Sequence, residues 1–64
     1  MKIKRVKGME FLIDFEYIPD THVREMIERL MKKGMEVRRI CIGLCLVEGN
    51  LREIKKVLRD YLGN

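Results

Sequence analysis

The side chains best suited to bind a soft metal ion or to undergo redox chemistry are Cys41, Cys45 and His22. A structural zinc site usually takes four ligands, often with two residues between paired cysteines, whereas three residues separate this pair. On one extended strand the two cysteines would lie about 13 Å apart, too far to share an ion or to form a disulfide. Only a hairpin that turns at residues 42–44 would bring the thiols together. We therefore expect free thiols packed in a core, no metal site and no cofactor.

Acid–base chemistry has few candidates as well. Glu10, Asp14 and Glu16 alternate along one segment, so their carboxylates would share one face of a strand. Lysine or arginine side chains on a neighbouring strand would pair with these carboxylates as readily as a substrate would. His22 is expected in the first turn of a helix, where it would be solvated. Since the chain also has no serine, we expect no catalytic site.

Basic residues carry the stronger functional signal. The chain has 14 Lys+Arg and 10 Asp+Glu, which gives a net charge of +4. Residues 1–7 contain four of the cations and no acid, whereas the acids outnumber the cations over residues 8–20. Such a basic segment can contact phosphates, although the chain has no Gly-x-x-Gly loop and no aromatic RNA-binding signature. The candidate nucleic-acid-binding residues are Lys2, Lys4, Arg5, Lys7, Arg38 and Arg39.

Composition bounds the size and surroundings of the protein. Sixty-four residues make one domain at most, expected over residues 1–64, with residues 1–8 as a basic N-terminal strand or arm. The longest run free of polar and charged residues, 40–47, is far shorter than the roughly 20 residues that span a bilayer. We therefore expect a soluble cytoplasmic protein that does not bind membranes. A 38% share of charged residues, with no Gln or Ser, is typical of hyperthermophile proteins and of an archaeal-like composition.

Alternating apolar residues predict a half-buried strand near the N-terminus. The buried side would comprise Met9, Phe11, Ile13, Phe15 and Tyr17. Gly8 precedes this strand, so residues 2–7 form either a separate short strand or the same strand continued through a bulge. Pro19 ends the strand, because the residue before a proline is held extended.

Two later segments have apolar residues at helical spacing. The first runs from a cap at Asp20 or Thr21 to Gly34, and the second from a cap at Asn50 to Gly63. Between them, residues 35–48 have no polar side over 40–47, which indicates a central strand covered on both faces. A tight hairpin at residue 43 is the other interpretation, with two short strands in place of one.

The element order is therefore β-α-β(β)-α, and a helix between two strands favours a crossover that joins parallel neighbours. This pattern predicts an α+β fold of two layers, with both helices on one face of the sheet. If the chain turns at Gly43, residues 9–62 resemble in topology the ferredoxin-like arrangement of small-molecule-sensing regulatory domains, truncated by its last strand. The resemblance carries no functional residue with it.

The second face of such a sheet would be apolar and uncovered. Each exposed aliphatic side chain would cost roughly 1.5–3 kcal/mol relative to burial, which so small a domain cannot offset. We therefore expect another copy to complete the truncated sheet, most simply as a two-fold dimer. The expected interface residues are Leu12, Ile40, Ile42, Leu44 and Leu46. The favoured function is a small, non-enzymatic, homo-oligomeric interaction or regulatory module, and the alternative is an RNA- or DNA-binding protein that uses the basic N-terminal segment.

Overall fold

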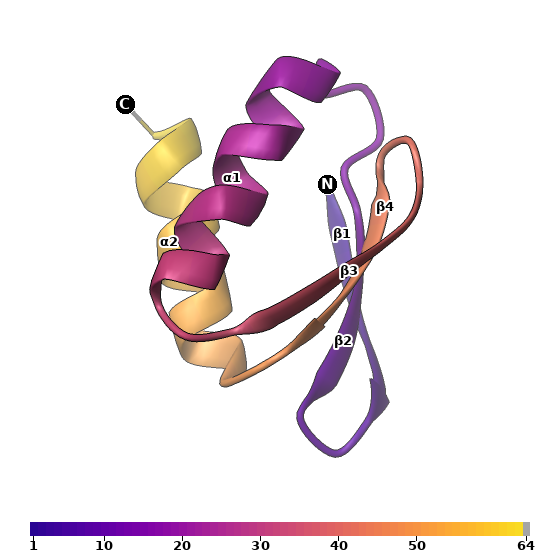
Figure 1. Cartoon of the computed structure of the whole chain (residues 1–64), viewed down its shortest axis with the longest axis vertical. Coiled ribbons are helices and arrows are strands. Elements are labelled where there is room, and N and C mark those ends of the chain that lie inside the picture. Colours follow the sequence, from indigo (N-terminus) through magenta and orange to yellow (C-terminus); the bar gives the residue numbers. More distant parts are fainter. Residues whose placement is uncertain (64) are drawn as a thin grey trace.

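The computed structural model describes residues 1–63, so residue 64 of the expected domain lies outside the described part. The elements in chain order are β1 (Lys2–Lys7), β2 (Glu10–Asp14), α1 (Asp20–Lys32), β3 (Glu36–Cys41), β4 (Leu44–Glu48) and α2 (Leu51–Leu62). The strands form one antiparallel sheet in the order β1-β2-β4-β3, and both helices lie on the same face of it (Figure 1). The expected α+β class, with two helices on one face, is confirmed.

The chain turns at both Gly8 and Gly43, the two positions where the sequence left the path of the chain open. Residues 2–7 form a separate strand, and the segment after α1 is a hairpin that turns at Gly43. Gly8 and Gly43 have φ values of 50° and 79°, a left-handed conformation that glycine adopts without steric cost. The chain therefore contains two hairpins, each followed by a helix.

The expected strand neighbours are wrong. β2 and β3 are parallel, but β4 lies between them and pairs antiparallel with both. The sheet is not truncated either, because β1 supplies a fourth strand beside β2. The ferredoxin-like order is not confirmed.

The first long strand ends earlier than its alternation predicts. The side chain of Asp14 accepts a hydrogen bond from the N–H of Glu16 at 2.9 Å, and Glu16 takes a φ of 51°, so the chain turns here. Phe15 still enters the core, but Tyr17 is 97% exposed. Met9 lies outside β2 and is 52% exposed, so the expected places of Met9 and Tyr17 on the buried side of a strand are both wrong.

The expected N-terminal cap is found at α2 but not at α1, where Asp20 or Thr21 was expected. Asn50 caps α2 as expected, with its side-chain oxygen accepting from the N–H groups of Arg52 at 2.9 Å and Glu53 at 3.3 Å. The cap of α1 is Pro19, which has no side-chain cap bond. Its carbonyl instead accepts from the N–H of Val23 at 3.1 Å.

One core fills the space between the sheet and the two helices. The buried side chains are Phe11, Ile13, Phe15, Val23, Met26, Leu30, Met35, Cys45, Val47, Ile54, Val57 and Leu58. Each inner strand contributes alternate residues to it, as in a sheet with one covered face. The core therefore occupies only the helix side of the sheet.

The two hairpins repeat each other at an offset of 34 residues, and each is followed by a helix. β1 and β3 have the same burial pattern along their six residues, and so do β2 and β4 along their five. Both hairpins also have a bulge at the same position, after residue 5 and after residue 39. Since β2 pairs with β4 so that Leu12 faces its equivalent Leu46, an approximate two-fold axis passes between these leucines.

Candidate functional site

The sheet face without helices, here called the open face, carries three rows of side chains. In the strand order β1, β2, β4, β3, these rows are Lys7, Glu10, Glu48, Glu36; then Lys4, Leu12, Leu46, Arg38; then Lys2, Asp14, Leu44, Cys41. The rows hold four cations and four carboxylates. The open face as a whole is therefore close to neutral, but its cations lie on the two edge strands, three on β1 and one on β3.

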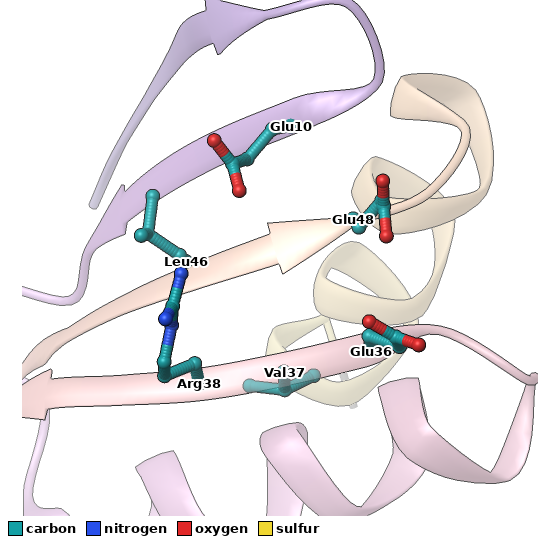
Figure 2. Close-up of a pocket in the computed structure, with 6 residues that line it drawn as sticks. All are labelled: Glu10, Glu36, Val37, Arg38, Leu46 and Glu48. Atoms are coloured by element: carbon teal, nitrogen blue, oxygen red, sulfur yellow. The ribbon is translucent and has the colours of Figure 1, made fainter.

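Only three of the five expected interface residues lie on the open face. Leu12, Leu44 and Leu46 do so, and each is half-buried; the long side chains of Lys4 and Arg38 flank Leu12 and Leu46. Figure 2 shows Arg38 reaching from β3 toward Leu46. Ile40 sits at the bulge and Ile42 in the turn, where it is 86% exposed, because the hairpin breaks the alternation.

Three carboxylates stand in a row across neighbouring strands at one end of the open face. Glu10, Glu48 and Glu36 line a shallow depression together with Arg38 (Figure 2). Like charges directly opposite each other destabilise a sheet, and none of these three has an ion pair within residues 1–63. No group of three or more metal-binding side chains in the described chain has the geometry to hold an ion.

Positive charge gathers instead where β1 meets α2. Ile3 of β1 and Lys55, Leu58 and Arg59 of α2 line one groove, which brings the two ends of the chain together. A second concave area lies along α2 itself. We call the following eight residues, which lie on both sides of the sheet along the edge formed by β1, the basic surface: Lys2, Lys4, Arg5, Lys7, Arg52, Lys55, Lys56 and Arg59.

The basic surface is poorly compensated. None of its eight cations forms an ion pair with another described residue. Glu53 and Asp60, the two acids of α2, are seven residues apart and share the side of the helix that faces α1. Arg5 lies 5.3 Å from the centre of the Phe11 ring, a cation–π contact that holds its guanidinium over β2 on the helix side of the sheet.

The structure divides the expected nucleic-acid-binding residues between the two edges of the sheet. Lys2, Lys4, Arg5 and Lys7 lie together on β1, whereas Arg38 and Arg39 lie on β3 at the opposite edge. Arg39 is also committed to an ion pair with Asp20 of α1. The hydrogen bond from Arg39 lowers the pKa of Asp20, so this carboxylate stays charged beside it. Arg38 and Arg39 are therefore not part of the basic surface.

The α2 cations were left out of the expected binding residues, although their spacing carried a signal. Residues 52, 55, 56 and 59 recur at three and four positions, so they form one side of the helix. What the sequence did not show is that this side of α2 lies next to β1.

A small polar network joins α1 to α2. The Tyr61 hydroxyl donates to Glu25 at 2.7 Å and lies 2.7 Å from Nδ1 of His22, while Arg29 stacks 4.8 Å from the ring centre. The hydrogen bond to Glu25 raises the pKa of Tyr61, which keeps its hydroxyl protonated. His22 is thus not merely solvated as expected. The network is exposed and its members satisfy one another, so it acts as a clamp between the helices.

The two thiols lie in different surroundings. Cys45 is fully buried, as expected, and burial raises its pKa to about 11, so the thiol is neutral and unreactive. Cys41 is exposed on the open face, so its expected place in the core is wrong. It pairs in register with Leu44 next to the hairpin turn, where no helix covers it.

No helix in the described part of the chain is long and apolar enough to cross a bilayer. Comparison of the chain with protein-family models, with curated proteins and with solved structures found no match.

Proposed function

We propose that this chain binds nucleic acid through the basic surface and holds the phosphate backbone without reading base sequence. The observation that carries the proposal is that β1, with four cations, forms the sheet edge next to α2, which has four more, so that cations lie on both sides of this edge. No ion pair within the described residues neutralises them. Uncompensated positive charge gathered in one region of a protein surface is the usual footprint of phosphate binding.

The layout of the cations suits a phosphate backbone. Residues 52 to 59 rise about 10 Å along the axis of α2, roughly the axial length of three nucleotides of one strand. β1 presents its cations over about 17 Å in the adjacent part of the surface. Such contacts fix position on a nucleic acid but carry no sequence information.

The side chains of the basic surface also favour a duplex over a single strand. None of the eight is aromatic, and single-strand binding typically depends on bases stacked on aromatic rings. A duplex offers a dense row of phosphates without requiring such stacking. We therefore expect double-stranded DNA or RNA to bind more tightly than single strands.

A pair of charge-matched variants tests this proposal. Changing Arg52, Lys55 and Arg59 to Gln removes three cations from the basic surface, and changing Arg24, Lys32 and Lys33 to Gln removes three from α1 and the residue that follows it. Fluorescence anisotropy with a labelled duplex of mixed sequence gives the affinity of each variant at several salt concentrations. The first variant should lose about 100-fold in affinity near 0.1 M salt, and its slope of log K against log salt should be less steep by about 3. The second should bind almost as the parent does.

Two outcomes would overturn the proposal. Equal losses in the two variants would mean that net charge, and not this surface, governs binding. Retention by anionic lipid vesicles with no binding to any duplex at about 50 mM salt would show that the surface serves a membrane instead.

Self-association is a second proposed role, in line with the homo-oligomeric module that the sequence favours. The observation that supports it is the free edge of β3, at the far side of the sheet from the basic surface.

A further inference from the structure

We infer that β3 pairs with β3 of a second copy about a two-fold axis at Val37, which joins the two sheets into one antiparallel sheet of eight strands. Three properties of this edge support the pairing: the direction of its backbone groups, its charges, and the apolar side of α1 above it.

The backbone direction follows from the hydrogen bonds between β2 and β4. The N–H of Gly49 donates to the carbonyl of Met9, and the N–H of Phe15 donates to that of Gly43, both at 2.8 Å. Antiparallel pairs alternate between bonded and non-bonded, so Leu46 and Glu48 point their backbone groups toward β3 and bond Arg38 and Glu36. Val37 and Arg39 therefore direct their N–H and C=O groups away from the sheet.

Charge selects one register for the new pairing. With Val37 opposite Val37 of the second copy, Glu36 faces Arg38 of that copy on the open face, and the two-fold axis makes this pair twice. Shifting the axis to Arg38 would place arginine opposite arginine. The chosen register also gives Glu36, which faces Glu48 inside the chain, the positive partner that residues 1–63 do not supply.

The helix layer has apolar side chains in the matching place. Asp20 pairs with Arg39, which shows the side of α1 that lies over β3. Ile27 and Met31 follow at seven and eleven positions along the same side, where Ile27 is half-buried and Met31 is 56% exposed. Because β3 is the strand next to the proposed axis, the two copies of α1 would lie beside each other across it, and these side chains would cover each other.

β1 could not pair with itself in the same way. A two-fold axis at Ile3 would place Lys2 opposite Lys4 of the second copy. An axis at Lys4 would place the two copies of Lys4 opposite each other, and an axis at Arg5 would do so for Arg5. Lysines on an edge strand are a known protection against edge-to-edge association. The basic surface thus stays free at both ends of the eight-stranded sheet.

A charge-swap experiment tests the register. Sedimentation velocity at a series of micromolar concentrations should show a dimer for the parent chain. Glu36→Arg and Arg38→Glu should each weaken the dimer by about tenfold or more, because each sets like charges opposite each other twice. The double variant Glu36→Arg with Arg38→Glu should restore dimerisation, since arginine again faces glutamate. Glu53→Arg makes the same charge change on α2 and should leave the dimer unchanged.

The far-ultraviolet circular dichroism spectrum shows that each variant is folded. A parent chain that stays monomeric at high micromolar concentration would overturn the inference. So would a double variant no better than the single ones, a loss in Glu53→Arg equal to that in Glu36→Arg, or growth into open-ended polymers.

Discussion

β1 and β3 occupy equivalent positions in the two hairpin–helix units, yet we expect the free edge of β3 to pair with a second copy and that of β1 not to. Ile3 matches Val37 and Lys4 matches Arg38, and both strands have a bulge after the fourth residue. The main difference lies at the first position, where β1 has Lys2 and β3 has Glu36. With one acidic residue, β3 is complementary in charge to a second β3, whereas β1 has none and would repel a second β1; we propose that β1 instead contacts a polyanion. A repeated backbone thus becomes two kinds of surface through few side chains.

The largest effect should come from removing β1 altogether. Deletion of residues 1–7 strips the strand that pairs with β2 and removes Ile3 from the rim of the core. Because so small a domain has little stability in reserve, we expect the cooperative thermal transition to disappear. Changing Lys2, Lys4, Arg5 and Lys7 to Gln should keep that transition, because it keeps the strand. A truncated chain that still melts cooperatively near the temperature of the parent would show that β1 is an accessory arm.

Proline substitutions at equivalent positions of β3 and β1 test the two edges one at a time, without changing charge. Val37→Pro removes an N–H that points away from the sheet, so the monomer should fold while the dimer weakens by tenfold or more. Ile3→Pro makes the same change on β1 and should leave the dimer intact. Sedimentation velocity measures both. If Ile3→Pro dissociates the dimer and Val37→Pro does not, the copies pair through the wrong edge.

The two inner strands differ at a core position where β2 has Phe11 and β4 has the buried thiol of Cys45. Its pKa of about 11 lies above that of an unfolded thiol, so the native state keeps a proton that the unfolded chain has lost. The stabilising effect is complete below about pH 8.5 and should fall by roughly 2 kcal/mol as the pH rises to 11. Urea denaturation across this range measures it, and Cys45→Val should remove that part of the pH dependence. Identical curves for parent and variant would mean that Cys45 is not desolvated.

The smallest effect is expected at the polar network that joins α1 to α2. Tyr61→Phe removes the hydroxyl that joins His22 to Glu25 but keeps the ring on which Arg29 stacks. Since the network is exposed, the free energy of unfolding should fall by about 1 kcal/mol or less. Tyr17→Phe is the matched control and should change nothing, because Tyr17 is almost fully exposed. A loss of several kcal/mol at Tyr61 would mean that the clamp determines how the helices dock.

The sequence predicted the parts of the fold that depend on local patterns. Both helices, the core positions of β2 and the Asn50 cap follow from spacing and capping chemistry. The turn at Gly43 stayed open because an unbroken apolar run is compatible with one buried strand or with two short ones. The extent of β2 was overestimated because the Asp14 side chain bends the chain while the apolar alternation continues.

The candidate surfaces were less predictable, because both depend on neighbours distant in sequence. The basic charge of residues 1–7 was visible, but its association with α2 depends on β1 lying beside β2. For the same reason, Arg38 was grouped with the cations of β1, although it lies on β3 at the opposite edge of the sheet. The pairing of Glu36 with Arg38 of another copy depends on which backbone groups point outward, and the sheet register alone determines that.

Residue-resolved amide hydrogen exchange by NMR, at a protein concentration where the chain self-associates, tests the contrast between the two edges most directly. The N–H groups of Val37 and Arg39 should be strongly protected, because the second copy accepts their hydrogen bonds. The equivalent N–H groups of Ile3 and Arg5 should exchange rapidly, because β1 keeps a free edge. Equal protection at the two edges, or protection of β1 alone, would contradict the account.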